Sequence, residues 1–344
     1  MTREEVQQWL TDPDFPEPTR EVALVETHIS WVLLTDTRAY KIKKPVQFSV
    51  ADFSTLSQRH FFCERELLLN RRLTQGMYLG VLPVLRTGDR FSIGSGNTEI
   101  VDYALCMTRQ DTSRQMNLLL EKNEVTPAHM EQLAVRLAAF HQNAQRVGLP
   151  FDPEEKIRLF DDLRSIAGFV ELHLGKTARR NMEEALASAP FLIRRIFPRI
   201  KERIQLGFRI DGHGDLHSKN IFLLKEPVIF DCIEFNDSFR QIDLLDEIAF
   251  FCMDLEHYSK PDLASCFLDL YLRKMPCMPT EEDALIFLFF KWYRCNVRLK
   301  VNALRAAQAE DKTLFQLWLH AVREYLDQFY AYFLEQKTGV SSFT

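Results

Sequence analysis

The chain has 344 residues, of which 46% are hydrophobic and 26% charged, and its formal net charge at pH 7 is −5. This length favours two domains or lobes with a sizeable core, and the acidic balance argues against a dedicated nucleic-acid binder. Seven scattered cysteines without a C-x-x-C pair favour reduced thiols over a disulfide framework or a zinc site.

The first ten residues, MTREEVQQWL, are charged and amphipathic, and they lack the apolar core of a signal peptide. No stretch of the sequence approaches the roughly 20 uninterrupted apolar residues of a membrane-spanning helix. The sequence therefore predicts a cytoplasmic protein that binds neither membranes nor nucleic acid, and it leaves the oligomeric state open.

The N-terminal part of the chain has strand patterns around one helix. Residues 3–10 predict a short helix. Residues 21–48 alternate polar and apolar side chains and are rich in β-branched residues, which predicts an antiparallel meander. Residues 54–73 have a helical period and begin with Ser and Thr as capping residues. Further strand-like runs, punctuated by glycines, lie between residues 78 and 110.

The pattern changes near Gln110, after which the periodicity is almost wholly helical. The helical runs cover residues 114–146, 153–206, 242–257, 260–274 and 280–336. A hairpin at 221–230 is the one later strand signal. We therefore predict an α+β, bilobal fold with a small β-rich N-terminal lobe (1–110) and a large helical C-terminal lobe (111–344), joined by a hinge near 107–113.

Segment 211–235, DGHGDLHSKNIFLLKEPVIFDCIEF, carries the clearest chemical signal. His213, Asp215 and Asn220 stand at H-x-D-x-x-x-x-N spacing, and Asp231 follows an apolar run. Phosphoryl transfer uses this set, because one carboxylate orients the attacking hydroxyl and takes its proton while an amide and a second carboxylate hold magnesium. We therefore predict Asp215 as the catalytic base and Asn220 and Asp231 as magnesium ligands.

The competing interpretation is that such side chains only hydrogen-bond the backbone of their own turn. His213 is expected to pack and hydrogen-bond beneath the loop, whereas His217 lies either near the phosphates or at the surface. Asp243 shares a helix face with Asp246 and is expected to accept hydrogen bonds from loop backbone amides. An acidic helix N-terminus explains Asp243 nearly as well.

Two lysines late in the third predicted strand, Lys41 and Lys43, are two residues apart and therefore point to the same sheet face. Lys41 is the candidate for contacting nucleotide phosphates, with Glu66 as its ion-pair partner and Glu64 as the second choice. Lys43 is the weaker nucleotide-binding candidate, since both lysines could instead decorate an edge strand.

Two arginines near the C-terminus, Arg294 and Arg298, share a helical face. They are candidates for binding an anionic substrate, although a solvated basic face is the commoner explanation. The basic run at 191–203 is interpreted as solvated.

The motif from His213 to Asn220, together with Asp231, resembles the Brenner-type motif of the aminoglycoside phosphotransferase-like kinases, which are relatives of protein kinases. The match is closer to an uncharacterised bacterial branch of that superfamily. The segments that resemble this branch are ETHISWV (26–32), YKIKKPV (40–46), CERELLLNRRL (63–73), YLGV (78–81) and FDCIEFN (230–236). The resemblance implies a protein-kinase-like bilobal fold with ATP between the lobes.

By position in this motif, Asp215 would be the base, Asn220 and Asp231 the magnesium ligands, and Lys41 and Glu66 the phosphate-binding pair. The strand ending near Met107 would meet adenine through its backbone, and helices from 115–206 and 280–336 would bind the acceptor. Three departures stand out: the turn at 27–30 has no glycine, Lys219 replaces a common glycine, and Glu247 stands where an aspartate is expected.

We therefore expect an ATP- and magnesium-dependent kinase acting on a hydroxyl of a small molecule. The alternatives are a nucleotide-binding pseudokinase, a protein Ser/Thr kinase and a metal-dependent phosphoesterase, whose GDxH motif the loop also matches. An aminoglycoside acceptor is disfavoured, because polycations meet acidic pockets and this chain offers Arg294 and Arg298.

Overall fold

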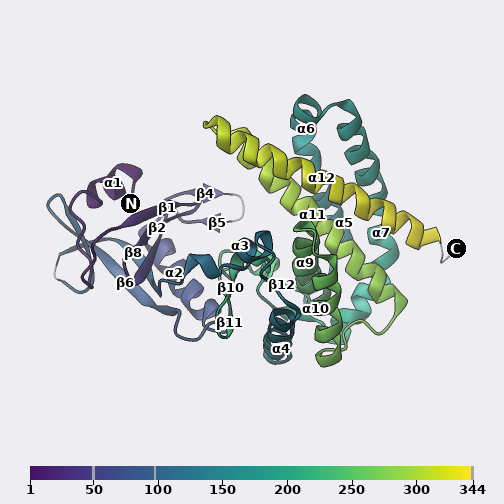
Figure 1. Cartoon of the computed structure of the whole chain (residues 1–344), viewed down its shortest axis with the longest axis horizontal. Coiled ribbons are helices and arrows are strands. Elements are labelled where there is room, and N and C mark those ends of the chain that lie inside the picture. The colour runs from purple at the N-terminus through teal and green to yellow at the C-terminus, as the bar shows by residue number, and fades with distance from the viewer. Residues whose placement is uncertain (49–50, 97, 342–344) are drawn as a thin grey trace. The chain divides into compact units, whose positions relative to one another are not determined.

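The computed structural model describes residues 1–48, 51–96 and 98–341 (Figure 1). Unit 1 comprises residues 1–123, 213–215 and 219–240, and unit 2 comprises residues 124–212, 216–218 and 241–344. The predicted α+β class is confirmed, with most strands in unit 1 and the long helices in unit 2. The sequence-based boundary at 110/111 stays a prediction, whereas contacts extend unit 1 to Asn123 and assign the 219–240 segment to it.

Unit 1 is built on a six-stranded sheet in which every neighbouring pair is antiparallel. In spatial order its strands are β1 (Ala23–Glu26), β2 (Ser30–Leu34), β3 (Arg38–Lys43), β8 (Glu99–Thr108), β6 (Tyr78–Thr87) and β7 (Arg90–Ile93). The predicted meander corresponds to β1, β2 and β3, and its period-2 alternation gives the sheet two different faces.

One face of the sheet carries an apolar cluster that packs with α1 (Arg3–Trp9), whose N-terminus Thr2 caps. From β3 it takes Tyr40 and Ile42. The opposite face of β3 presents Ala39, Lys41 and Lys43, so the two lysines lie on one face as predicted from their spacing. The register places Val32 opposite Lys41 and Ser30 opposite Lys43.

Helix α2 (Leu56–Asn70) packs against β8 and β6. It begins at Thr55, which forms a capping box with Gln58. The remaining short elements of unit 1 are β4 (Gln47–Phe48), β5 (Ala51–Asp52), η1 (Thr112–Arg114), α3 (Met116–Glu121), β10 (Ile221–Leu223), β11 (Pro227–Ile229) and α8 (Asp237–Arg240). The predicted hairpin is β10–β11, with Ile221 paired to Ile229, and the turn η3 (Ser218–Asn220) leads into it.

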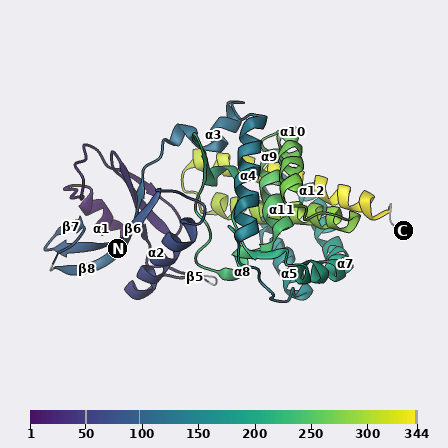
Figure 2. The same cartoon turned by 90° about the horizontal axis from the view of Figure 1, so that it is seen from below.

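Unit 2 consists mainly of helices, and Figure 2 shows α4, α9 and α10 side by side. Its elements are α4 (Pro127–Asn143), α5 (Pro153–Asp161), η2 (Asp162–Ile166), α6 (Ala167–Leu174), α7 (Lys176–Gln205), β9 (Arg209–Asp211), β12 (Gln241–Asp243), α9 (Leu244–His257), α10 (Pro261–Lys274), α11 (Glu281–Gln308) and α12 (Lys312–Ser341). Helix α11 packs along α12 and α9. Among the described residues, no helix combines the length and apolarity needed to cross a membrane.

Candidate active site

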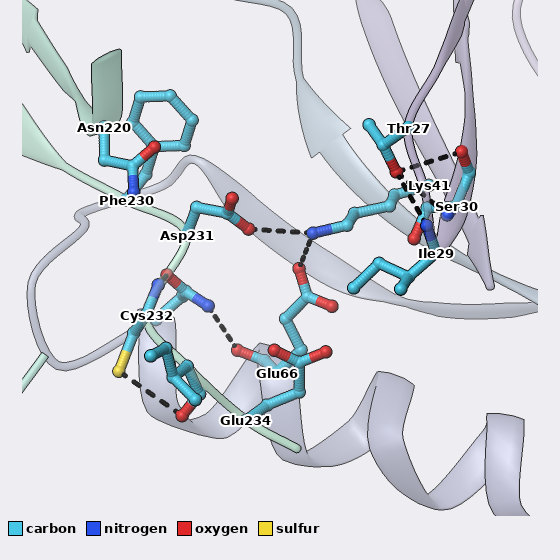
Figure 3. A network of polar contacts seen from close by, with 12 residues as sticks. Thr27, Ile29, Ser30, Lys41, Glu66, Asn220, Phe230, Asp231, Cys232 and Glu234 are labelled. Carbon is cyan, nitrogen blue, oxygen red and sulfur yellow. Dashed lines mark hydrogen bonds and ion pairs between the residues drawn. The ribbon is translucent and has the colours of Figure 1, made fainter. Parts of the chain in front are cut away.

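Five charged side chains of unit 1 form a continuous network, the lysine–carboxylate cluster (Lys41, Lys43, Glu66, Asp231 and Glu234). Figure 3 shows Lys41 between Glu66 and Asp231. Lys41 Nζ lies 2.7 Å from Glu66 Oε1 and 2.8 Å from Asp231 Oδ1. Lys43 Nζ lies 2.7 Å from Glu66 Oε2 and also donates to Glu234. The cluster therefore links β3, α2 and the segment after β11.

The cluster is buried at one end and open at the other. Lys43 and Glu66 are 0% exposed and Glu234 is 3% exposed, whereas the Asp231 side chain is 43% exposed. Burial favours a neutral Lys41, but the charges of Asp231 and Glu66 outweigh it and raise the Lys41 pKa well above its ordinary value. Burial raises the pKa of Glu234 despite the nearby Lys43.

Glu66 is the shared partner of both lysines, with one carboxylate oxygen for each. Burial opposes its ionised form, but Lys41 and Lys43 prevail and lower the Glu66 pKa to about 2. The second candidate, Glu64, is exposed and lies 3.7 Å from His60. The structure thus pairs Lys41 with the first of the two candidate glutamates.

Asp231 has a left-handed backbone conformation, with φ of 63°, at the exit of the hairpin. Its N–H donates to Tyr78 Oη at 3.2 Å, and the next N–H, of Cys232, donates to Asn70 Oδ1 at 2.9 Å. Just before it, the Phe230 N–H donates to the Asn220 carbonyl at 3.0 Å. These contacts fix the backbone on both sides, so the turn presents the Asp231 carboxylate to Lys41 and to solvent.

The predicted base and one predicted metal ligand are hydrogen-bonded to each other. Asn220 Nδ2 donates to the Asp215 carbonyl at 3.0 Å and to Asp215 Oδ2 at 3.1 Å. His213 Nδ1 accepts from the Asp215 N–H at 3.2 Å, so its Nε2 carries the proton and donates to the Phe230 carbonyl at 2.8 Å. The His213 ring therefore connects the backbone of Asp215 in the loop to the backbone of Phe230 at the end of the hairpin.

Glycine is required at position 214, where φ is +86°. A Cβ at this position would lie 2.6 Å from the Phe239 carbonyl oxygen and 3.1 Å from Arg240 Cα. Backbone atoms leave such a contact no relief, so a side chain would displace the loop that carries Asp215.

Asn220 and Asp231 fit a magnesium site of the kind that substrate phosphates complete. The described residues contain no group of three or more His, Cys, Asp or Glu that could hold a metal by themselves. Magnesium bound to nucleotides uses one or two protein groups, phosphates and waters. The Asn220 amide nitrogen donates to Asp215 and the Asp231 carboxylate is 43% exposed, so the donor oxygens of both residues are of the type that magnesium binds.

An apolar surface of unit 1 lies on the same sheet face as Lys41, around a buried cluster that includes Ala39 and Met107. Met107 is 7% exposed and pairs with Ala39 across β3 and β8. The half-buried side chains of this apolar surface are Val32, Leu34, Val81, Leu224, Val228 and Phe230.

The turn between β1 and β2 is held by a side chain. Thr27 Oγ1 accepts from the Ser30 N–H at 2.9 Å and from the Ile29 N–H at 3.3 Å, and Thr27 N–H donates to the Ser30 carbonyl at 2.9 Å (Figure 3). The Thr27 side chain therefore binds two backbone amides of this turn. In a glycine-rich loop such amides would be available to bind phosphate.

Several predicted site residues belong to unit 2 and have structural contacts there. His217 is 5% exposed, with its ring centroid 5.5 Å from that of Phe250, so the surface interpretation is wrong. Asp243 caps α9 through the Leu245 N–H at 2.8 Å and pairs with the buried Arg203 at 2.7 Å.

These contacts correct two expectations. The carboxylate that accepts from a loop amide is Asp254, which receives the Ser218 N–H at 2.7 Å, and Asp243 instead serves as a helix cap. Arg203 is 0% exposed, so the basic run at 191–203 is not solvated throughout.

Arg294 and Arg298 are buried, at 7% and 9% exposure, so a solvated basic face is excluded. Arg294 Nε donates to Asp246 at 2.5 Å, and the Arg298 guanidinium lies 5.8 Å from the Tyr325 ring centroid. Their role in substrate binding stays a prediction. Because both arginines are buried, they no longer speak against a polycationic acceptor.

Sequence reasoning missed Glu234, Tyr78 and Asn70, which complete the surroundings of Asp231. Glu234 had one signal, since a charged residue within the short run after Asp231 needs a partner if the run is buried. The polar contacts of Tyr78 and Asn70 had none, because they join residues more than 150 positions apart.

Replacing Glu66 tests the cluster. Glu66→Gln is expected to destabilise the protein by about 3–5 kcal/mol, because it removes one partner from buried ion pairs. The exposed Glu64→Gln is the matched control and should stay within about 0.5 kcal/mol. Because the Glu66 pKa is lowered from 4.5 to about 2, its contribution is complete above pH 4.5 and disappears as the pH falls toward 2.

Urea unfolding of both variants across this pH range measures the effect. The difference in free energy of unfolding between the native chain and Glu66→Gln should become smaller as the pH falls. A gap that does not depend on pH, or one equal to that of Glu64→Gln, contradicts the paired cluster.

The chain has relatives of similar sequence, although no family model matches it. Over 311 residues it is 31% identical to uncharacterised proteins of Mycobacterium bovis and Mycobacterium tuberculosis. The alignment covers 86% of this chain and 58% of each relative, so the chain spans less than two thirds of their length.

Solved structures that resemble this one include an ethanolamine kinase from Plasmodium vivax, at 10% identity over 89% of this chain and 81% of that chain, with a TM-score of 0.49. The GDP complex of aminoglycoside 2′-phosphotransferase-IIIa is 13% identical over 94% and 98%, with a TM-score of 0.49. A thermostable mutant of aminoglycoside phosphotransferase APH(4)-Ia is 9% identical over 95% and 98%, at 0.48.

Proposed function

We propose that this protein is an ATP- and magnesium-dependent phosphotransferase that phosphorylates a hydroxyl of a small molecule, with Asp215 as the base. The observation that carries the proposal is that unit 1 brings together a lysine–glutamate pair, an exposed carboxylate after a hairpin, and an aspartate hydrogen-bonded to an asparagine. Positioning and charge stabilisation account for most of the catalysis of phosphoryl transfer, and these groups supply both.

Lys41 would bind the nucleotide phosphates. Its ammonium now lies between the buried Glu66 and the exposed Asp231, whose side chains are 1% and 43% exposed. Entering phosphate oxygens would replace the exposed partner and leave the buried one in place. The apolar surface beside Lys41 offers half-buried aliphatic and aromatic side chains against which a purine can pack.

Asp231 and Asn220 would hold magnesium, which when bound shields the negative charge of the phosphate oxygens. Freed from Lys41, the Asp231 carboxylate is available as a ligand, and Asn220 contributes its amide oxygen. Asn220 also donates a hydrogen bond to Asp215, so one side chain would both bind the metal and orient the base.

Asp215 would accept the proton of the acceptor hydroxyl as the oxygen attacks phosphorus. Its backbone is fixed from below by His213, and one of its carboxylate oxygens is oriented by Asn220. These contacts would keep the Asp215 carboxylate in a fixed orientation as it accepts the proton of the hydroxyl.

A pseudokinase is the second candidate, and the turn at 27–30 is the observation that favours it. Thr27 occupies two of the amides of this turn, so the turn contributes less to binding phosphates than a glycine-rich loop would. On this interpretation the protein binds nucleotide without turnover.

Thermal unfolding with ligands separates the candidates. Magnesium and ATP together should raise Tm by several degrees, because a ligand at 100 times its Kd adds about 2.7 kcal/mol. ATP with EDTA, or magnesium alone, should raise it much less, and parallel assays of ADP release should identify an acceptor in a panel of hydroxyl metabolites. A protein that neither gains stability nor releases ADP contradicts both candidates, and stabilisation without turnover supports the pseudokinase.

A further inference from the structure

The Lys43 side chain is fully buried and is surrounded by three other side chains. It is 0% exposed, and its ammonium contacts Glu66 Oε2 and Glu234 and lies 5.1 Å from the Phe53 ring centroid. A phosphate could reach this group only by breaking two buried ion pairs. Its earlier assignment as a nucleotide-binding residue therefore has no support in the geometry, and its contacts call for another role.

The two ion pairs of Lys43 lead to the two groups that would act in the reaction. Lys43 pairs with one oxygen of Glu66, and Lys41 pairs with the other. Lys43 therefore helps to orient the carboxylate that binds Lys41. Through Glu234, three residues after Asp231, it restrains the segment that carries this carboxylate.

The same segment is also hydrogen-bonded directly to α2. The Cys232 N–H donates to Asn70 Oδ1 at 2.9 Å, and Asn70 Nδ2 donates to the Glu66 carbonyl at 2.9 Å. The backbone after Asp231 is thus attached to α2 through Asn70 and to β3 through the Lys43–Glu234 ion pair, and Lys43 in turn pairs with Glu66 of α2.

The geometry points to Lys43 and Glu234 as a buried positioning pair that keeps Lys41 and Asp231 at the separation needed to bind magnesium and phosphate together. This inference rests on the proposed function. The Lys41–Asp231 contact opens when magnesium and nucleotide bind, whereas the Lys43–Glu234 pair stays closed. Neither Lys43 nor Glu234 touches the substrate.

Glu234→Gln tests the pair, because it keeps the side-chain shape and a hydrogen-bond acceptor while removing the charge. A displacement of about 1 Å in a catalytic group costs about 100-fold in rate, so kcat should fall about 10- to 100-fold. KM for ATP should change less than about threefold, since the nucleotide contacts remain. The magnesium concentration that gives half-saturation should rise at least about fivefold, because the segment of Asp231 loses one of the contacts that position it.

Asp102→Asn is the matched control, since Asp102 forms a buried ion pair with Arg59 in the same unit, at 0% and 7% side-chain exposure. It should lower Tm without changing the magnesium dependence. If Glu234→Gln does not fold, the double variant Lys43→Met with Glu234→Gln, which leaves neither charge of the pair, is measured in its place.

Binding of Mn²⁺ in the presence of ATP, followed by electron paramagnetic resonance, makes the outcome independent of turnover. An Mn²⁺ affinity weakened about fivefold in Glu234→Gln but not in Asp102→Asn supports the positioning pair, even if the native chain transfers no phosphate and the proposed reaction fails. Unchanged Mn²⁺ affinity and kcat overturn the inference. A large rise in KM for ATP at constant kcat also overturns it, because it would mean that the pair contacts nucleotide.

Discussion

Asp215→Asn is expected to slow phosphate transfer at least about 100-fold while leaving the binding of magnesium and ATP nearly unchanged. A positioned general base contributes about 10²- to 10⁴-fold to rate, and an amide in its place cannot accept the proton. Asparagine keeps the shape of the side chain and a carbonyl oxygen for the Asn220 amide, now 3.1 Å from Asp215 Oδ2. The backbone contacts of this position to His213 and Asn220 do not depend on the carboxylate.

Rapid-quench assays of product formation measure this loss, and calorimetric titration with magnesium and ATP measures binding. Asp89→Asn, at an exposed position between β6 and β7, is the control and should behave as the native chain does. Turnover within tenfold of the native rate in Asp215→Asn would eliminate Asp215 as the base. A simultaneous loss of nucleotide binding would mean that the residue is structural.

Asp231→Asn is expected to remove the magnesium dependence of both binding and turnover. The bound ion contributes several kcal/mol to the transition state, and each 1.36 kcal/mol corresponds to a tenfold change, so kcat should fall by about two to four powers of ten. The fold should survive, because the Asp231 side chain is 43% exposed and solvent screens its pair with Lys41. Lys41 also retains Glu66 at 2.7 Å.

Asp237→Asn is the matched control, since Asp237 follows in the same segment, is 46% exposed and pairs with Arg65 and Arg240. Magnesium titrations of Tm and of ADP release compare the two variants. If both lose the magnesium response, the segment acts as a whole and Asp231 is not a specific ligand. If Asp231→Asn keeps a native magnesium response, the ion binds elsewhere.

The elements that carry the site could be predicted because their signals are local. Alternation in β3 placed Lys41 and Lys43 on one face, the apolar runs around 221–230 gave the hairpin, and the Ser/Thr start of α2 marked its cap. Glu66 and Glu64 point to different sides of α2, so helical geometry allows only one of them to pair with Lys41, and the structure shows that it is Glu66.

The contacts that fix the site could not be predicted, because they join positions far apart in the chain. Lys43 and Glu234 are 191 residues apart, and nothing in their local sequence marks them as partners. Arg203 and Arg294 misled for a related reason, since basic residues on helices are usually solvated, whereas these two are buried against Asp243 and Asp246. Burial of a charge is decided by its partner, and the partner is a tertiary feature.

Single-turnover measurement with ATP labelled in its γ-phosphate tests the central claim most directly. The native chain, mixed with magnesium and a panel of hydroxyl acceptors, should transfer the label to one acceptor class within a single burst, and Asp215→Asn and EDTA should each suppress the transfer by at least about 100-fold. Label that stays on ATP with every acceptor, or appears only as inorganic phosphate at the same rate in Asp215→Asn, contradicts the assignment of this chain as a phosphotransferase.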